Sequence, residues 1–363
     1  MIPNELCDDL LEAQGKPKGD VRLAVCNNCG HLFNRAFDEQ LVAYAKGYEN
    51  PLHHSPLFRT FAEDLVQYLV HRYSLSGKRV VEIGCGDGYL LDLLHKHGVV
   101  EGLGFDPSMA DRVSPFIKSA AVKIVPEYFG AESLKGEFDF VVCRHVLEHL
   151  SDPLSLLKML RKNIGDNHVP VYFEVPNGEW VLKSTSLWDV IYEHVSYFTA
   201  PSIEYLFRES GFTPTRISTH YGEQFLSIEA FPSQDNIVAA PSTHDLPALA
   251  SDFKMNSESI IGNWNDYLRS VNGCVVVWGA GSKGISFANL FAGLGRPVEA
   301  IVDLNPNKHG MNVPGSGTPV IAPEELVALN PDVVLIANRQ YEPEIKARLT
   351  QMGIHSDIES IVA

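Results

Sequence analysis

The stretch that decides the fold reads Glu82-Ile83-Gly84-Cys85-Gly86-Asp87-Gly88. An apolar pair, Val80-Val81, leads into it, as expected for a buried parallel strand. A helical pattern over residues 89–97 follows it, with leucines at positions 90, 91, 93 and 94. A strand, a glycine turn and a helix in this order form the turn of a doubly wound sheet that binds a phosphate or a nucleoside. The glycines allow the backbone to approach a ligand that a side chain would hold away.

A second predicted strand supplies an acidic residue for the same site. It covers residues 102–105 and ends in Asp106, 18 residues after Gly88, where a carboxylate suits the two hydroxyls of a ribose. The spacing Glu-x-Gly-x-Gly-x-Gly resembles motif I of the class I S-adenosylmethionine (SAM) methyltransferases, which implies SAM as the cofactor. A generic nucleotide fold, or a degenerate copy of one, is the alternative. The SAM-binding residues implied in these segments are Glu82, Gly84, Cys85, Gly86, Asp87, Gly88, Asp106 and Pro107.

Composition argues against several partner classes. The chain has 29 Lys and Arg against 45 Asp and Glu, a net charge of −16, whereas nucleic acid and anionic membranes attract basic surfaces. Its 363 residues predict two to three domains. No apolar run approaches the roughly 20 residues that cross a bilayer, and residues 1–20 show no signal-peptide core. Six scattered cysteines are typical of a reduced, cytoplasmic protein, and we expect a monomer or a homodimer.

A candidate metal site lies near the N-terminus. Cys26 and Cys29 have the spacing of half a zinc site, which needs four ligands. The usual second Cys-x-x-Cys pair is missing, and Cys7 and His31 are the only nearby residues that could complete the set. The pattern is compatible with a bound zinc ion and equally with the relic of a zinc ribbon.

A candidate lid follows in residues 44–56, which include Tyr48 and His54 and precede a helical pattern over residues 58–71. A segment rich in aromatic and imidazole groups at this place could cover the SAM site, because methyl transfer requires that water be excluded. The alternative is an ordinary surface connection with solvated histidines.

Two further strand ends extend the predicted cofactor site. Residues 121–125 form a strand that Glu127, Tyr128 and Phe129 follow, where an acidic and aromatic group could recognise adenine. Residues 138–143 form the next strand, which ends in Arg144 and His145 at the edge that closes such a pocket. Glu148 and His149 come next, and we predict a structural role for His149 at the start of a helix.

The best candidate for a general base is His194, in the segment Tyr192-Glu193-His194-Val195-Ser196-Tyr197-Phe198. An imidazole with a pKa near ~6.5 can take a proton at neutral pH, and Glu193 could orient it. Asn177 ends another predicted strand nearby. A helix end with a solvated histidine and a buried aromatic pair is the alternative interpretation.

A second glycine turn opens the C-terminal part of the chain. Residues 232–248 have the composition of a linker, and residues 249–271 are helical in pattern. Gly279-Ala280-Gly281-Ser282-Lys283-Gly284 then follows a strand, and the next strand ends in Asp303. The spacing is that of a dinucleotide fingerprint and favours an NAD-linked sugar oxidoreductase. Residues 271–363 leave no separate substrate domain, so we predict a Rossmann-like accessory domain instead.

Taken together, these residues resemble the sugar C-methyltransferase family. Its members carry an N-terminal zinc-binding segment, a central SAM domain and a C-terminal Rossmann-like domain, and they act on nucleoside-diphosphate ketosugars. The most specific match runs from Trp278–Gly284 to the pattern Asp303-x-Asn305-Pro306-x-Lys308-x-Gly310, and Glu193–Phe198 is a second match. The fold implied is α/β, a class I SAM methyltransferase followed by a second Rossmann-like domain. The implied parts are residues 1–57, 58–232, 233–270 and 271–363.

The resemblance also implies a mechanism and a substrate. His194 would remove a proton beside the carbonyl of a nucleotide-linked ketosugar, Glu193 would orient it, and Asn177 or Tyr48 would stabilise the enolate. Tyr192 stands one position away from the tyrosine of the family pattern, which leaves the catalytic role of Tyr192 in doubt. The substrate would contact Tyr48, His54, Ser196, Tyr197, Ser282, Lys283 and Asn305. Methylation of oxygen or nitrogen on another small molecule, and an oxidoreductase or idle scaffold, are the alternatives.

Overall fold

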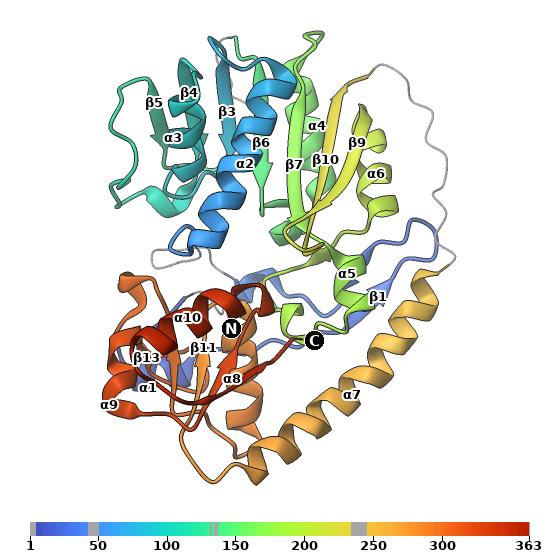
Figure 1. Ribbon diagram of the computed structural model, residues 1–363. Helices are drawn as coiled ribbons and strands as arrows, with labels where there is room; N and C mark the ends of the chain where they lie inside the picture. The colour runs from blue at the N-terminus through green and yellow to red at the C-terminus, as the bar shows by residue number, and fades with distance from the viewer. Residues whose placement is uncertain (1–4, 43–50, 131–132, 134–136, 234–244, 363) are drawn as a thin grey trace.

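The computed structural model describes residues 5–42, 51–130, 133, 137–233 and 245–362. Figure 1 shows two α/β units, one above the other, with the long helix α7 (Leu246–Ser270) running along one side. The N-terminal segment lies between the units and against the lower one.

The upper unit is built on a seven-stranded sheet in the order β5-β4-β3-β6-β7-β10-β9. The strands β5, β4, β3, β6 and β7 are parallel, while β10 runs antiparallel to both β7 and β9. This order, with its antiparallel final hairpin, is that of a class I methyltransferase and confirms the predicted fold. The strands are β3 (Arg79–Ile83), β4 (Glu101–Phe105), β5 (Val122–Val125), β6 (Phe140–Arg144), β7 (Val171–Pro176), β9 (Phe212–His220) and β10 (Phe225–Pro232).

Helices cover both faces of this sheet because its strands are apolar on both sides. On one face, Val80 and Phe140 pack with helices α2 and α3. On the other, Val81 and Val141 pack with α4 and α6, in keeping with the two-residue period of a strand. The helices are α2 (Pro56–Tyr73), α3 (Tyr89–Lys96), α4 (Pro153–Ile164), α5 (Gly178–Lys183) and α6 (Ala200–Glu209), with short 3₁₀ turns η2 (Pro107–Met109), η3 (Leu147–His149) and η4 (Leu187–Asp189).

The lower unit is a second Rossmann-like layer with a five-stranded parallel sheet in the order β13-β12-β11-β14-β15. Its strands are β11 (Val275–Trp278), β12 (Ala300–Val302), β13 (Val320–Ile321), β14 (Val333–Ile336) and β15 (Asp357–Ser360). Its helices are α8 (Ser282–Gly293), α9 (Leu326–Leu329) and α10 (Glu342–Gln351), with turns η5 (Pro306–Lys308), η6 (Pro323–Glu325) and η7 (Arg339–Tyr341).

The N-terminal segment attaches to both units. Helix α1 (Leu10–Gly15) lies in a stretch whose Cys7 pairs with Asn312, and Leu6 enters the lower core. The hairpin of β1 (Leu23–Val25) and β2 (Leu32–Asn34), which the turn η1 (Glu39–Leu41) follows, pairs instead with β8 (Ser196–Tyr197). Residues far apart in sequence therefore fix the segment that carries His194.

Candidate active site

The first glycine turn forms an open cradle at the end of β3. Gly84, Gly86 and Gly88 have φ angles of +72°, +51° and +82°, a region that other residues rarely adopt. A Cβ built at Gly86 would meet no heavy atom within 4 Å. Asp106 closes the cradle, since its Oδ2 accepts a hydrogen bond from the Gly86 amide at 2.8 Å. An open glycine turn next to a strand-end carboxylate fits the nucleoside part of SAM.

One cavity of about 560 Å³ starts at this cradle and continues to the second glycine turn. Pro51–Ser55 line it at the place predicted for the lid, and His53 stacks at 4.9 Å on Tyr89. Trp278 and Lys283 line its far end. The predicted cofactor residues that line it are Glu82, Gly84, Cys85, Gly86, Asp87, Asp106, Pro107, Tyr128, Phe129, Arg144 and His145.

Two predicted cofactor residues lie outside the cavity lining. Gly88 is the N-cap of α3, where a Cβ would approach the side chains of Ile117 and Ile124. Glu127 is exposed to solvent, whereas its neighbours Tyr128 and Phe129 line the cavity. Sequence position after a strand end does not determine which side chain turns inward.

A buried ionic network supports the cofactor side of the cavity. Arg144 pairs with Glu174 at 2.7 Å, and Tyr172 donates a hydrogen bond to the same carboxylate at 2.9 Å. Burial alone would raise the pKa of Glu174, but Arg144 and His145 outweigh it and hold that pKa at about 2. Burial raises the pKa of Glu82 well above its usual value, and Arg144 only partly opposes this. The site therefore holds one fixed carboxylate and one that resists ionisation.

Glu148, His149 and His194 gather in the middle of the cavity lining. Each offers one nitrogen or oxygen ligand atom, and these atoms all lie within 4.8 Å of one another. The rings of His149 and His194 are 4.9 Å apart and nearly perpendicular. Burial and the neighbouring His149 lower the pKa of His194 to about 3, so its imidazole is neutral at physiological pH. His149 was expected to be structural, and the structure instead places it in the cavity wall.

Three residues expected beside His194 in catalysis do not line the cavity. The Tyr192 hydroxyl accepts a hydrogen bond from the Asp38 amide at 2.9 Å, so this side chain points to the N-terminal segment. Glu193 is fully buried, and its carbonyl oxygen contacts His149 Nδ1 at 3.1 Å. Asn177 caps α5, and its Nδ2 donates to the Glu223 carbonyl at 2.9 Å. Their backbone or capping contacts position the loops around the site.

The residues expected to contact substrate fall into two groups. His54, Ser282 and Lys283 line the cavity. By contrast, Ser196 and Tyr197 are buried outside it. Ser196 Oγ contacts His31 Nε2 at 3.1 Å, and the Tyr197 hydroxyl donates to the Ile191 carbonyl at 3.0 Å.

The remaining two expected substrate contacts are not in the lining either. Asn305 is 1% exposed and caps the turn η5, with its Oδ1 accepting from the Asn307 amide at 3.0 Å. Tyr48 lies outside the described residues.

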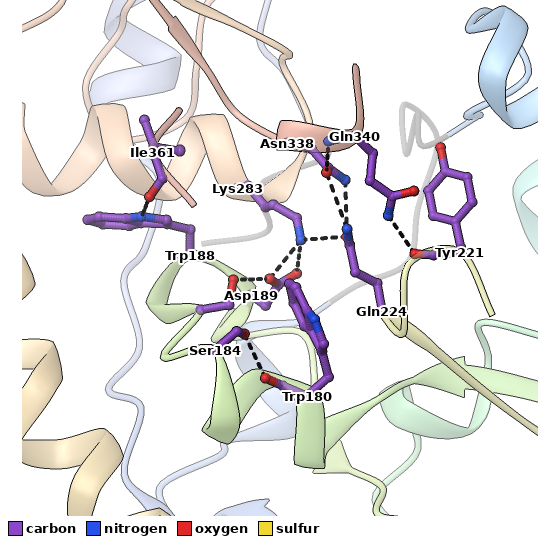
Figure 2. Close-up of polar contacts among 11 residues, drawn as sticks. Trp180, Ser184, Trp188, Asp189, Tyr221, Gln224, Lys283, Asn338, Gln340 and Ile361 are labelled. Carbon is purple, nitrogen blue, oxygen red and sulfur yellow. Dashed lines mark hydrogen bonds and ion pairs between the residues drawn. The ribbon is translucent and has the colours of Figure 1, made fainter. Parts of the chain in front are cut away.

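Lys283 joins the two units at the bottom of the cavity (Figure 2). Its ammonium group lies 2.6 Å and 2.7 Å from the two carboxylate oxygens of Asp189, and it donates to Gln224 Oε1 at 3.1 Å. It also lies 5.1 Å from the ring centroid of Trp180. Gln224 in turn accepts a hydrogen bond from Asn338 at 3.0 Å, and the whole set crosses between the units (Figure 2).

The second glycine turn is occupied by side chains of its own domain. Asp303 Oδ2 accepts a hydrogen bond from the Ala280 amide at 2.7 Å. Lys308 is 4% exposed, and its ammonium group donates to the Ala280 carbonyl at 2.7 Å. The Asp303 carboxylate takes up the Ala280 amide, one of the donors that a dinucleotide would use, and the Lys308 side chain fills space beside the turn.

The predicted zinc ligands do not assemble into a four-ligand site. Cys7 lies in the bridge to Asn312, and His31 contacts Ser196. Within the described ranges, neither joins Cys26 and Cys29 in a group of three metal-ligating side chains. Cys26 and Cys29 therefore remain a pair in the turn between β1 and β2.

Comparison with known proteins identifies the family. A model of a methyltransferase domain matches residues 55–217, and a model of the C-methyltransferase C-terminal domain matches residues 251–357. The C-methyltransferase NovU of Streptomyces niveus is 24% identical over 369 residues, which is 95% of this chain and 86% of that protein. The chain therefore resembles C-methyltransferases along almost its whole length, and the two models match its two α/β units in turn.

Other relatives match only part of the chain. A tRNA U34 carboxymethyltransferase of Sulfurimonas denitrificans is 38% identical over 100 residues, covering 25% of this chain and 33% of that one. A ubiquinone biosynthesis O-methyltransferase of Pseudomonas aeruginosa is 35% identical over 135 residues, which is 32% of this chain and 58% of that protein. The chain thus spans one third to three fifths of these relatives. The solved structure of magnesium protoporphyrin IX methyltransferase from Synechocystis is 19% identical, with a TM-score of 0.38, and covers 48% of this chain and 84% of that one.

Glu148 and His149 were named without a catalytic role, although their place after a strand end, where ligands bind in parallel sheets, was a usable signal. Asp189 and Gln224 also line the cavity and were not singled out, because their places depend on how the two units meet. Within the described ranges, no helix combines the length and apolar character that crossing a bilayer requires.

Proposed function

We propose that this protein transfers the methyl group of SAM to a carbon atom of a nucleotide-linked ketosugar. The observation that carries the proposal is the single cavity that joins a SAM-type glycine turn, a histidine cluster and the second glycine turn. The name of the relative NovU, a C-methyltransferase that matches almost the whole chain, supports carbon as the acceptor.

The proposed cofactor supplies an electrophilic methyl group on a sulfonium when it is bound. The open turn at Gly84–Gly88 and the Asp106 carboxylate would hold its nucleoside part. Asp106 Oδ1 accepts from the Ser108 amide at 2.9 Å, which fixes the carboxylate in place. The lid residues Pro51–Ser55 would exclude water from the reacting atoms.

His194 is the proposed base. Its imidazole is neutral, lines the cavity and lies within reach of the Glu148 carboxylate, whose charge raises the pKa of His194 against the effect of burial. A proton would pass from the substrate carbon to His194, and the resulting enolate carbon would attack the methyl group. Glu148 would then stabilise the imidazolium, whereas Glu193 was expected to orient His194. Closure over a substrate would strengthen this pairing because water is displaced.

The second glycine turn is the proposed site for the nucleotide end of the substrate. Ser282 and Lys283 begin α8 and line the cavity there. Lys283 already contacts Asp189 and Gln224, so a diphosphate would have to share this ammonium group with them. A neutral base in one part of the lining and a cation in another fit an acceptor with an anionic tail.

The decisive experiment follows a deuterium label on the acceptor carbon. Protein, SAM and a panel of nucleotide ketosugars are analysed by mass spectrometry, and we expect a product that gains one methyl group and loses the carbon-bound label. The variant His194→Asn should lower kcat by about a hundredfold or more, the usual contribution of a general base. His97→Asn, which alters an exposed pair with Glu63, serves as the matched control and should retain activity.

Oxygen methylation is the second candidate, and the similarity to ubiquinone biosynthesis O-methyltransferases within the SAM-type domain favours it. In that case the product retains the deuterium. His194→Asn then lowers kcat less than in carbon methylation, because a hydroxyl is easier to deprotonate than a carbon. Calorimetry with SAM and with NAD tests the oxidoreductase alternative. Binding of NAD without binding of SAM would overturn the proposal.

A further inference from the structure

We propose that Glu148, His149 and His194 form a binding site for one divalent ion of the zinc class, and that this ion inhibits methyl transfer. The ligand atoms of these three side chains lie within 4.8 Å of one another, and it is the one such group among the described residues. The site is separate in place and chemistry from the Cys26 and Cys29 pair.

The spacing of the three groups suits a metal better than direct hydrogen bonds. His149 Nε2 and Glu148 Oε1 are 3.9 Å apart, which is too far for a hydrogen bond. Ligands on a tetrahedral zinc ion with bonds of about 2.1 Å stand about 3.4 Å apart. Since the ligand atoms lie up to 4.8 Å apart, shifts of up to about 0.7 Å in each side chain would close the shell around an ion.

The polar atoms of the cluster are already desolvated. Glu148 is 1% exposed, and its Oε1 lies 3.5 Å from His145 Nδ1 in an ion pair, while in the described part of the chain neither of its carboxylate oxygens has a hydrogen bond. His194 Nδ1 is in the same condition. A buried carboxylate and a buried imidazole nitrogen that lack hydrogen bonds are costly unless something else occupies them.

His149 has the outer contact that a metal-binding histidine usually has. Its Nδ1 lies 3.1 Å from the Glu193 carbonyl oxygen, so this nitrogen carries the proton and donates it. The lone pair is then on Nε2, the atom that faces Glu148. Backbone carbonyls fix metal-ligating histidines in this way in known sites.

The donor set indicates the class of ion. Two imidazole nitrogens and one carboxylate oxygen match zinc, cobalt(II), nickel(II) and iron(II) sites, which keep open positions for water or substrate. Magnesium and calcium prefer all-oxygen shells and fit this cluster poorly. The open positions would face the cavity, because all three residues line it.

Inhibition follows from the role of His194, and this consequence rests on the proposed function. An ion bound through the His194 lone pair occupies the electrons that would accept the substrate proton. It would also neutralise Glu148, which stabilises the imidazolium. The metal-binding half of the proposal does not depend on the reaction.

The binding test starts from chelator-treated protein that carries Cys26→Ser and Cys29→Ser, so that the thiol pair cannot bind metal. Calorimetry with zinc should give one ion per chain. Cobalt(II) should give visible absorption bands without the intense near-ultraviolet charge-transfer band that thiolate ligands produce. Failure of this background protein to bind zinc would overturn the proposal.

The variants Glu148→Gln and His149→Gln, made in the same background, should each weaken zinc binding by about tenfold or more. His355→Gln removes an exposed histidine and should leave the affinity unchanged. Retained binding of SAM by each variant shows that the fold is intact. If zinc bound equally well to Glu148→Gln and His355→Gln, the ion would lie elsewhere and the proposal would fall.

Activity measurements separate the claim that the cluster binds a metal ion from the claim that this ion inhibits methyl transfer. Zinc should suppress both methyl transfer and loss of the deuterium label, and excess chelator should restore them. Zinc binding that depends on Glu148 but leaves transfer unchanged would confirm the metal site and overturn the assignment of His194 as the base. If zinc binding did not depend on Glu148 while loss of the deuterium label stayed normal, the metal site would be overturned and the assignment of His194 as the base would stand.

Discussion

His194 makes the stability of this protein depend on pH. Its pKa is about 3 in the folded chain against 6.5 for an unperturbed histidine, so the unfolded chain binds the extra proton between these values. Stability is therefore lost as the pH falls from 6.5 towards 3, by up to about 1.4 kcal/mol per pH unit from this residue. Asparagine cannot titrate, so His194→Asn should lose stability less steeply than the natural protein between pH 6.5 and 5. Urea unfolding at several pH values measures the stability of both proteins. Equal slopes of stability against pH would contradict the assigned pKa of His194.

Gly86 is where a single methyl group should separate cofactor binding from stability. Gly86 and Gly77 have φ angles of +51° and +77°, and a Cβ at either would meet nothing within 4 Å. Alanine at each position should cost about 1 kcal/mol of stability from backbone strain. Only Gly86→Ala places its methyl group in the cavity, so only this variant should lose SAM affinity. Calorimetry with SAM and thermal unfolding give the two readouts, and equal SAM affinities would exclude Gly86 from the cofactor site.

At the scale of elements, the sequence predicted the parts that depend on local pattern. The strand before Glu82, the helix after Gly88 and the carboxylate of Asp106 all follow from spacing along the chain. The helix predicted over residues 58–71 runs from Pro56 to Tyr73 instead, because Ser55 caps it and its hydroxyl accepts a hydrogen bond from the Phe58 amide. Such shifts of one or two residues reflect capping geometry and leave the topology unchanged.

The expected site residues that do not line the cavity differ from the others in which face of their segment reaches it. Ser196 and Tyr197 form β8, whose pairing with the β1–β2 hairpin buries both side chains away from the cavity. That hairpin comes from more than 160 residues earlier in the chain, as the contact between His31 and Ser196 shows. No periodicity within 192–198 carries this information. His149 was missed for the same reason, since its partner His194 arrives from another element.

For the whole molecule, Lys283 should couple the two α/β units. Its side chain is 14% exposed and that of Asp189 21% exposed, so removal of the cation leaves a partly buried carboxylate. Lys283→Met should lower stability by about 1–3 kcal/mol and split unfolding into two transitions. Lys183→Met breaks a pair with Glu179 whose side chains are 60% and 32% exposed, and should cost about 0.5 kcal/mol or less. Differential scanning calorimetry compares them, and one unchanged transition for Lys283→Met would show that other contacts hold the units together.

The attachment of the N-terminal segment to the lower unit sets an order of events during synthesis. Cys7 exchanges backbone hydrogen bonds with Asn312, and Leu6 packs in a core that also contains Val333 and Ile361. The ribosome therefore makes Cys7 roughly 300 residues before it makes Asn312. At synthesis rates of about 5–20 residues per second, the segment waits roughly 15–60 seconds for its partner. Throughout that interval the apolar side chains of the segment lack their partners in the lower core, so chaperones have long access to them.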